Sequence, residues 1–541
     1  QATWDKYQLT KEDLTVKTET DKLDSVDIKK AMVKADSLAK AQKKKITPPA
    51  IPEFLPNLEN LEDRTERLTI NSSSIADAKL SKDGEKLYYL ARYDKGFNLW
   101  VTSPRTKETK MLAQLDAMGG SLEMSKDGKA LFLLAGGNIM KIGIDDGKVT
   151  PVPINTTFTL NAVAERQYIF DHVCKQVKKK IFDPNIQGVD WDYYHDNYAK
   201  LLPYVNNDFD FEILLSELLG ELNVSHTGAF YSSSTPDGDR TASLGLLFDL
   251  SKGGNGLVVK DILSGGPFDK AATKIKRDYV IDKIDGIAIT DEEDWAKLLN
   301  FKAGKFTRIT FHDPKGGQEY NETIKPVTTA VERNLIYNRW VRKMEHLTDS
   351  LSHGEVGYVY VKAMDESSFR VTFDKTLGKN VDKKALIVDT RFNGGGWLHD
   401  DLVTFLGGKQ YFTFRPQGKK TKGGESADKW DKPSCVLICE GNYSDAFMFP
   451  YAYKELGIGK LIGMPVAGTG TAVWWENQIN NKLTFGIPMI ASWGTNETHA
   501  TENHQLEPDI KVSNDYNKVL AGEDQQLEAA VKEMLKEVAN K

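Results

Sequence analysis

The sequence has 541 residues, of which 27% are charged and 40% hydrophobic, with 43 glycines and 19 prolines. At roughly 100 to 200 residues per domain, this length indicates about three to five domains. The composition excludes collagen, a long coiled coil and a wholly disordered chain. The net charge of -6 lacks the basic excess with which proteins neutralise phosphates, so a nucleic-acid partner is not expected.

The cysteines Cys174, Cys435 and Cys439 are too few for a disulfide framework, and they fit either a cytoplasmic or a periplasmic or secreted location. No apolar stretch reaches the roughly 18 residues of a membrane span, so none is expected. The N-terminus lacks the zones of a signal peptide. Because the chain starts at Gln1 rather than Met, we expect a processed form or a segment cut from a longer protein.

Residues 1–65 are polar and predict a helix followed by a proline-rich extended linker. Over residues 66–157 the sequence changes to short β-rich runs, and a Ser-Lys-Asp-Gly pattern at 81–84 recurs at 125–128. Asp-Gly favours a tight hairpin turn, and a repeat of roughly 40 to 45 residues is typical of β-propeller blades. The recognisable blades are too few to close a ring. They predict a partial, propeller-like segment that is completed by other sequence or packs on another domain.

Residues 158–239 predict two or three helices, because apolar residues recur at intervals of three and four. Residues 240–328 return to β-strands with one helix among them. Their order, with the segment Leu-Gly-Leu-Leu-Phe at 244–248, resembles a PDZ module. In such modules this loop binds a peptide's terminal carboxylate while the peptide adds a strand to the sheet edge.

Residues 329–541 alternate strands and helices. The runs 385–389 and 435–439 are short, unbroken and apolar, which is typical of buried parallel strands. An amphipathic helix over 527–538 closes the chain. The segment therefore predicts an α/β core.

A serine follows the second of these strands. Ser444 lies between strand 435–439 and a helix predicted over 449–456, where the N–H of Asp445 would point at a developing oxyanion. On this segment alone, Ser444 is better explained as the cap of that helix.

The first strand ends in a glycine-rich loop, Asp-Thr-Arg-Phe-Asn-Gly-Gly-Gly at 389–396. Consecutive glycines cost backbone entropy, but they allow the backbone to approach a ligand closely. No phosphate-binding motif accompanies them. Together with Ser444, the loop predicts the other half of an oxyanion hole, with Gly394 and Gly395 beside the substrate.

A serine nucleophile needs a base, and His226 is a candidate because it follows a helical segment and lies next to Ser225. An isolated histidine is more often a surface or capping residue. No zinc-binding motif occurs, and neither a metal nor a cofactor is expected.

These segments together resemble the tricorn protease family of serine peptidases. The resemblance rests on 182–191 with 221–228, on the glycine loop 389–396, on 442–447, and on Thr-Glu-Asn-His-Gln-Leu-Glu-Pro-Asp-Ile at 501–510. It extends from about residue 60 to the C-terminus. It implies a multidomain α+β fold in this order: a partial β-propeller-like segment, a helical subdomain, a PDZ-like domain and an α/β serine peptidase core.

The resemblance implies that Ser444 is the nucleophile and His226 the general base. Ser225 and Glu502 match the residues that orient this base, and the amides of Gly396 and Asp445 match the oxyanion hole. This tetrad is chemically coherent, because a hydroxyl can hold one imidazole nitrogen while the other takes the serine proton.

The resemblance also implies a peptide or unfolded-protein substrate, and it allows a homo-oligomer. Two departures matter. Glu507 is a second carboxylate near Glu502, and Phe414 aligns with an aspartate that selects basic side chains in archaeal relatives. Phe414 therefore predicts a preference for apolar residues before the cut bond, although Asp400 or Asp401 could reach the pocket.

Two other functions remain open. A carboxyl-terminal processing protease would use a Ser-Lys dyad, but Lys454 and Lys460 lie too close in sequence to Ser444. A PDZ-bearing scaffold with an inactive hydrolase-like domain would bind peptides without cleaving them.

Overall fold

The computed structural model describes residues 72–540 except 94, 234, 236, 419–422, 496 and 497, together with a few positions between 29 and 69. The helix and linker predicted for residues 1–65 lie almost wholly outside the described residues. The chain divides into two compact units, Gln1–Thr159 and Leu160–Lys541. Each unit has hydrophobic clusters of its own.

Described strands of the first unit form antiparallel sheets in the orders β1-β2-β3-β4 and β5-β6-β7-β8. These strands are β1 (Ser74–Leu80), β2 (Leu87–Arg92), β3 (Phe97–Thr102), β4 (Thr109–Ala117), β5 (Ser121–Met124), β6 (Ala130–Ala135), β7 (Asn138–Gly143) and β8 (Val149–Val152).

The sequence repeat builds the same turn in both sheets. Ser81 Oγ donates to Asp83 Oδ1 at 2.6 Å, and Ser125 Oγ donates to Asp127 Oδ1 at 2.7 Å. In each turn the glycine N–H then bonds the serine carbonyl. Each repeat therefore starts a hairpin between the first two strands of its sheet, as the Asp-Gly pattern predicts.

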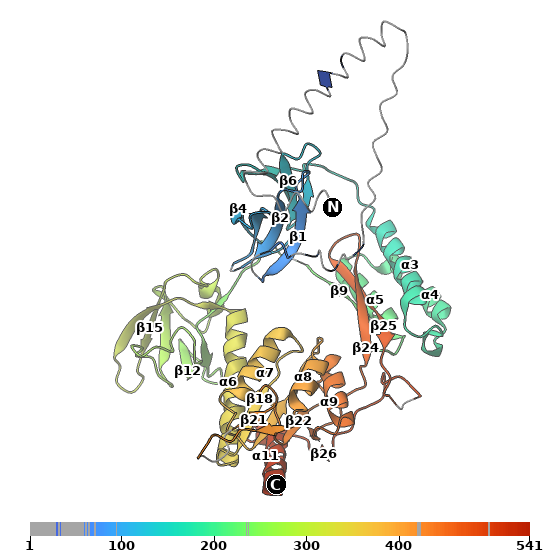
Figure 1. The fold of residues 1–541 in the computed structure, drawn as a ribbon. Helices are drawn as coiled ribbons and strands as arrows, with labels where there is room; N and C mark the ends of the chain where they lie inside the picture. Colours follow the sequence, from blue (N-terminus) through green and yellow to red (C-terminus); the bar gives the residue numbers. More distant parts are fainter. Residues whose placement is uncertain are drawn as a thin grey trace. The chain divides into compact units, whose positions relative to one another are not determined.

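The second unit begins with α3 (Ala162–Lys180), α4 (Trp191–Ala199) and α5 (Asp208–Gly220), each capped by an Asn or Asp side chain that accepts a backbone N–H. Their apolar faces pack on β25 (Leu483–Ala491). This strand lies between β24 (Thr471–Asn477) and β9 (Gly228–Tyr231) in an antiparallel sheet (Figure 1). A segment from late in the chain therefore completes the core of the helical region.

A second antiparallel sheet follows, in the order β11-β12-β13-β15-β16 with β14 beside β13. Its strands are β11 (Leu246–Phe248), β12 (Leu257–Ile262), β13 (Val280–Ile284), β14 (Ile287–Ala288), β15 (Thr307–His312) and β16 (Glu319–Ile324). The short strands β10 (Ala242–Ser243) and β17 (Val327–Thr328) pair where the chain enters and leaves this region. This region also contains the 3-10 helix Trp295–Leu299.

The rest of the unit is built on a parallel sheet in the order β18-β19-β22-β23-β26. The strands are β18 (Val356–Tyr360), β19 (Ala385–Asp389), β22 (Ser434–Ile438), β23 (Lys460–Gly463) and β26 (Ile510–Lys511). A separate hairpin joins β20 (Phe412–Thr413) to β21 (Gly424–Glu425). The helices are α6 (Thr329–Leu351), α7 (Glu366–Leu377), α8 (His399–Leu406), α9 (Asp445–Glu455), α10 (Tyr516–Ala521) and α11 (Gln525–Ala539).

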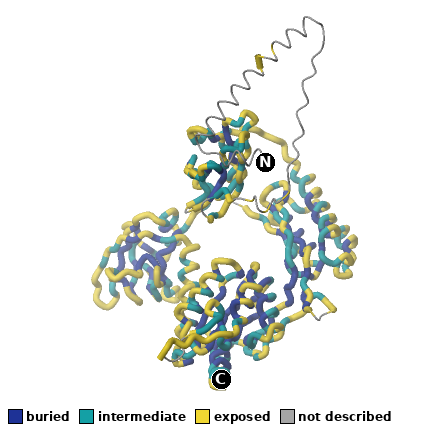
Figure 2. Tube along the Cα trace, viewed as in Figure 1, coloured by how far each residue is buried: buried dark blue, intermediate teal, exposed yellow. Residues whose placement is uncertain are grey.

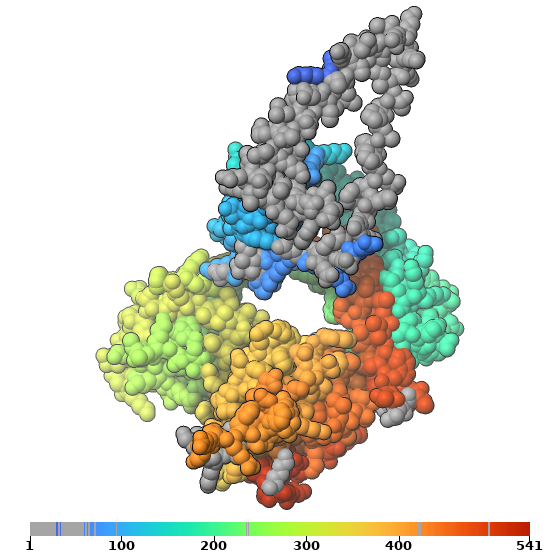
Figure 3. Space-filling view, viewed as in Figure 1, coloured from blue at the N-terminus to red at the C-terminus, as the bar shows by residue number. Residues whose placement is uncertain are grey.

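Helices cover both faces of this parallel sheet. Leu386 and Val388 face α8 and α9, whereas Ala385 and Ile387 face α6 and α11. Every residue of β18, β19 and β22 is buried (Figure 2). The space-filling view shows the segment that follows residue 330 in contact with the C-terminal residues (Figure 3). The continuous apolar runs in the sequence are therefore strands buried on both faces.

The mixed α/β multidomain fold is confirmed, but one predicted boundary is wrong. Helix α9 begins at Asp445, directly after Ser444, rather than at Phe449. Buried Ala446 and Phe447 pack into the sheet's core and extend the helix towards the serine, so Pro450 lies inside it. Among the described residues, no helix is long and apolar enough to cross a membrane.

Candidate active site

Ser444 occupies a strained turn between β22 and α9. Its backbone has φ 57° and ψ -125°, a conformation that costs a non-glycine residue free energy. Its side chain makes no capping hydrogen bond. Instead, Ser444 Oγ lies 2.8 Å from His226 Nε2, and the Ser444 N–H donates to Thr469 Oγ1 at 2.8 Å. The simple helix cap considered from the sequence is therefore not what this serine forms.

His226 lies in the loop between α5 and β9, with a positive φ of 61°. Its N–H donates to the Tyr443 hydroxyl at 2.7 Å. On the other side of the ring, Nδ1 lies 2.9 Å from Ser225 Oγ and 2.8 Å from Thr471 Oγ1. Burial lowers the pKa of His226 from its usual 6.5, because a charged imidazole is poorly solvated there. The ring is thus favoured in its neutral form, with Nε2 facing Ser444.

A buried carboxylate completes the chain of contacts. Ser225 Oγ donates to Glu502 Oε2 at 2.9 Å, and the Ser225 N–H donates to Glu502 Oε1 at 2.6 Å. Burial raises the pKa of Glu502, although the hydrogen bonds from Ser225 oppose this shift. Glu507, by contrast, is exposed and lies 3.6 Å from Lys511 Nζ. The carboxylate in contact with Ser225 is that of Glu502.

The glycine loop after β19 lies against the serine turn. A Cβ on Gly395, whose φ is 99°, would lie 2.6 Å from the Cβ of Ser444. A Cβ on Gly396, whose φ is 144°, would lie 2.1 Å from the Met364 carbonyl oxygen. Both positions therefore require glycine, for space as well as for backbone conformation.

Two backbone amides, one in the glycine loop and one in the serine turn, have no hydrogen-bond partner among the described residues. Among the hydrogen bonds of the described residues, the N–H groups of Gly395, Trp397 and Ser444 have acceptors, whereas those of Gly396 and Asp445 have none. Unpaired N–H groups beside a nucleophile are the arrangement that stabilises an oxyanion.

The side chain of Asp445 ties the two loops together. Its carboxylate, which is 1% exposed, accepts the N–H groups of Leu398 at 2.5 Å and His399 at 3.1 Å. It also lies 2.5 Å from His399 Nδ1, and this hydrogen bond raises the pKa of His399. The serine turn thereby caps α8, the helix that follows the glycine loop.

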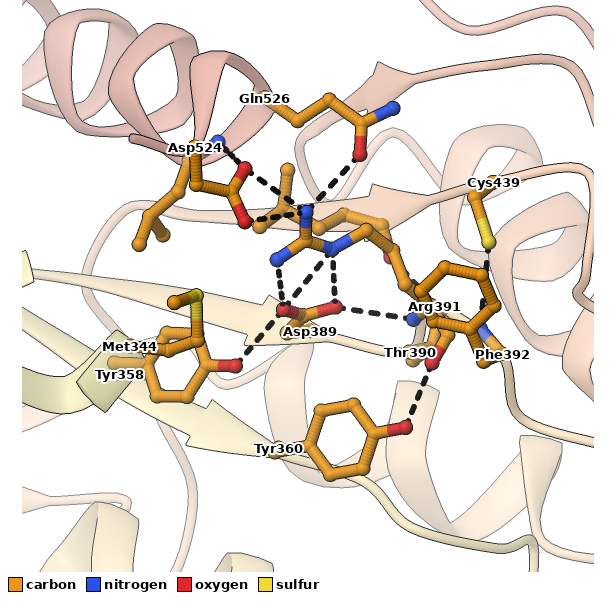
Figure 4. Close-up of polar contacts among 12 residues, drawn as sticks. Met344, Tyr358, Tyr360, Asp389, Thr390, Arg391, Phe392, Cys439, Asp524 and Gln526 are labelled. Carbon is orange, nitrogen blue, oxygen red and sulfur yellow. Dashed lines mark hydrogen bonds and ion pairs between the residues drawn. The ribbon is translucent and has the colours of Figure 1, made fainter. Parts of the chain in front are cut away.

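A buried ionic network anchors the start of the glycine loop (Figure 4). Arg391 is 2% exposed and pairs with Asp389 at 2.7 Å and with Asp524 at 2.9 Å. Tyr358 donates to Asp389, and Gln526 accepts from Arg391. Burial alone would lower the pKa of Arg391, but these carboxylates raise it above its usual value. The loop is thus held against the N-terminus of α11.

Comparison with known proteins finds two matching family models. The family model "Peptidase family S41" matches residues 355–512, and "Tricorn protease C1 domain" matches 162–220. The chain is 25% identical over 506 residues to "Tricorn protease homolog 1" of Streptomyces coelicolor, covering 88% of this chain and 47% of the relative. The chain is therefore similar to the tricorn proteases, and its residues 355–512 match the S41 peptidases.

Two further comparisons also find similarity to tricorn proteases. The chain is 22% identical over 472 residues to "Tricorn protease" of Thermoplasma acidophilum, covering 84% of this chain and 42% of the relative. The solved structure "Crystal structure of the tricorn protease" superposes with a TM-score of 0.72 at 20% identity, covering 84% of this chain and 46% of that one. This tricorn-like chain therefore spans less than half the length of these relatives.

Not every predicted residue joins the hydrogen-bonded cluster of this tricorn-like chain. Phe414 lies in the β20–β21 segment, about half exposed, and Gly394 is exposed in the glycine loop. Asp400 and Asp401 are exposed in the first turn of α8.

The lysines of the Ser-Lys alternative are engaged elsewhere. Lys454 Nζ donates to the Glu507 carbonyl at 3.0 Å and lies 3.1 Å from Asp509. Lys460 pairs with Glu533 on α11. Neither side chain contacts Ser444.

Three residues that contact the tricorn-like site are not among the predicted site residues. Thr469 bonds the backbone of Ser444, Thr471 contacts His226 and Ser225, and Tyr443 accepts the His226 N–H. The available signal was the Ala-Gly-Thr-Gly-Thr segment at 467–471, where hydroxyls alternate with glycines. Among the described residues, no group of His, Cys, Asp or Glu is arranged to hold a metal ion.

Proposed function

We propose that this chain is a serine peptidase that hydrolyses peptides with Ser444 as nucleophile and His226 as general base. The observation that carries the proposal is the unbroken path of contacts from Ser444 Oγ through His226 and Ser225 to Glu502, each between 2.8 and 2.9 Å. These are the distances at which a base can take a serine proton and be oriented by its neighbours.

The reaction would run through an acyl-enzyme. Ser444 Oγ attacks the peptide carbonyl carbon while its proton passes to His226 Nε2. His226 then gives this proton to the leaving amine as the carbon–nitrogen bond breaks. Water attacks the resulting ester, its proton passes through His226 back to Ser444 Oγ, and the acid product leaves. Ser225 and Glu502 hold the ring and stabilise its charged form.

The oxyanion would be bound by the unpaired amides of Gly396 and Asp445. Gly395 supports this assignment, because its close approach to Ser444 keeps the glycine loop beside the reacting carbon. The free N-terminus of α9 adds a positive partial charge at the same place.

We assign 66–157 as propeller-like blades, 158–239 as the helical domain, 240–328 as a PDZ-like domain and 329–541 as the catalytic domain. The repeated hairpin turns support the first assignment. The PDZ-like domain would bind an extended peptide at its sheet edge or act as a spacer. The substrates would be peptides or unfolded proteins, and a homo-oligomer is compatible with the likeness to tricorn proteases.

Specificity before the cut bond should favour apolar or aromatic residues if Phe414 lines the pocket. A lysine or arginine there would lose water without gaining a carboxylate partner, which costs several kcal/mol. Fluorogenic peptides that differ only at this residue test the preference. Faster turnover of the Arg or Lys peptide than of the Leu or Phe peptide would contradict it.

The proposed activity is tested with a fluorophosphonate probe, which reacts with activated serines. We expect covalent labelling of the folded chain and peptide hydrolysis, both absent in Ser444→Ala. Well-folded protein that neither reacts nor hydrolyses peptides would favour the peptide-binding scaffold instead.

A further inference from the structure

Thr471 places a second hydroxyl at the ring nitrogen of His226 that faces away from Ser444. Thr471 Oγ1 lies 2.8 Å from His226 Nδ1 and 2.8 Å from Ser225 Oγ. The residue is 3% exposed, so water does not compete freely for these contacts. The three polar groups thus form a closed triangle beside Glu502.

The protons of this triangle can be assigned by elimination. Glu502, when ionised, only accepts, so the Ser225 hydroxyl proton is directed to Oε2. If Nδ1 carried no hydrogen, the single Thr471 proton could serve Nδ1 or Ser225 Oγ but not both, and the other 2.8 Å contact would bring two lone pairs together. With Nδ1 protonated, Thr471 donates to Ser225 Oγ. His226 must supply the remaining hydrogen, from Nδ1–H to Thr471 Oγ1 and Ser225 Oγ. This arrangement satisfies every group only when Nδ1 carries the proton and Nε2 is the acceptor.

The backbone holds Thr471 rigidly. It is the first residue of β24 and pairs with Ala491 of β25, and the adjacent Gly470 carbonyl accepts the Ser492 N–H at 2.9 Å. A threonine side chain on a strand is also restricted at χ1. The hydroxyl is therefore fixed by a sheet, whereas Ser225 and His226 lie in a loop.

We infer that Thr471 is a positioning residue, which keeps His226 in the tautomer able to accept the Ser444 proton and shares with Ser225 the task of holding Nδ1–H. The inference rests on the proposed peptidase function. The other groups that face the ring are Tyr443, whose ring centroid lies 4.8 Å away, Glu502 through Ser225, and Ser444.

The kinetic test compares three variants of the full chain. Thr471→Val replaces the hydroxyl by a methyl group of similar shape, Thr471→Ser restores a hydroxyl, and Thr310→Val is the matched control. Thr310 is also 3% exposed and donates to Asn321 at 2.7 Å, within the β15–β16 pair. Thermal unfolding of each variant checks that it is folded.

Thr471→Val should lower kcat about tenfold, the kinetic equivalent of one buried hydrogen bond, with KM nearly unchanged. The acidic limb of kcat/KM should move to lower pH, because the charged ring has lost an acceptor. Thr471→Ser should recover most of the activity, and Thr310→Val should match the wild type. Ser225→Ala/Thr471→Val should be slower than either single variant.

Wild-type kcat and an unmoved acidic limb in Thr471→Val would overturn the inference. So would a Thr471→Ser variant as slow as the valine, because a packing role alone would then explain the loss. If Thr471→Val failed to fold, the serine variant and the spectroscopic measurement below would still decide.

A measurement of the tautomer separates this inference from the proposed function. The protein is labelled with ¹⁵N-histidine and studied by NMR. The ring signals of His226 are identified as those that disappear in the His226→Gln variant. We expect a protonated Nδ1 and an unprotonated Nε2 in the wild type, and a mixture in Thr471→Val. An unchanged tautomer would overturn the inference. If Ser444→Ala still hydrolysed peptides, the proposed peptidase mechanism would be refuted. The role of Thr471 in setting the tautomer would stand if the tautomer still shifted as expected in Thr471→Val.

Discussion

At the scale of residues, the contacts divide the proposed tetrad into groups expected to make bonds and groups expected to orient them. Ser444 Oγ and His226 Nε2 face each other directly, whereas Ser225 contacts the far side of the ring and Glu502 reaches it only through Ser225. Their losses should therefore differ in size.

Ser444→Ala and His226→Ala should each lower kcat by a factor on the order of 10⁶, as expected when the nucleophile or base of such a unit is removed. Ser225→Ala and Glu502→Ala should cost less, and combined losses should be far from additive. Steady-state peptide hydrolysis measures this, with Glu507→Ala as the control. If Glu507→Ala lost activity while Glu502→Ala kept full activity, the assignment of Glu502 as the orienting carboxylate would be wrong.

The acidic side of the pH profile should report His226. Because burial lowers its pKa below 6.5, the ring is neutral and competent at pH 7. Activity should be lost only as the pH falls through that lowered value, so the acidic limb of kcat/KM should lie below 6.5. Protonation of Glu502, whose pKa burial raises, would act in the same direction.

His399 provides the control for this profile, because its pKa is shifted upwards by Asp445. His399→Gln should leave the limb below 6.5 in place. An acidic limb above 6.5 in the wild-type chain, or a limb that disappears in His399→Gln, would show that the titration does not belong to His226.

At the scale of elements, the site depends on how closely two strand-to-helix turns approach each other. Gly395 of the first turn has no room for a side chain against Ser444 of the second, and Asp445 locks the second turn to α8. The amides proposed to bind the oxyanion belong to these turns, so their geometry should be sensitive to a single added carbon.

Gly395→Ala should abolish detectable hydrolysis, because a Cβ at 2.6 Å from Ser444 must push the turns apart and a φ of 99° strains any other residue. Peptide hydrolysis and fluorophosphonate labelling measure the effect. Gly253→Ala is the control, since no atom lies within 4 Å of its added Cβ. A Gly395→Ala chain that labels as fast as the wild type would show that the turns can separate without loss.

At the scale of the whole molecule, segments distant in sequence hold the active region together. The Arg391 network joins the end of β19 to Asp524, 133 residues later, just before α11. The β24–β25 hairpin similarly completes the core around α3 and α5. The parallel sheet and the helical region should therefore depend on the last third of the chain.

Arg391→Met should destabilise the second unit by about 3 to 5 kcal/mol, because it leaves Asp389 and Asp524 buried without a cation. The urea midpoint of this unit's unfolding measures the loss. Arg370→Met is the matched control, since its ion pair with Glu366 is exposed on both sides and is worth well under 1 kcal/mol. Equal midpoints for the two variants would mean that the buried network contributes no more than a surface pair.

Local features of the fold could be predicted from the sequence. Apolar runs located β19 and β22, repeated Asp-Gly turns located the hairpins of the first unit, and the glycine loop and Ser444 marked two strand ends. These signals are visible because periodicity and turn chemistry depend on neighbours in the chain.

Which distant groups meet depends on how the chain folds in three dimensions. Ser225 and Glu502 are 277 residues apart, and Ser225 and Thr471 are 246 apart. No spacing in the sequence encodes such distances. The resemblance suggested Glu502 without excluding Glu507, and Thr471 carried no signal beyond a hydroxyl among glycines. Packing of the β24–β25 hairpin against the helices brings Thr471 to the ring, because that placement buries the hairpin's apolar side chains in the helical core.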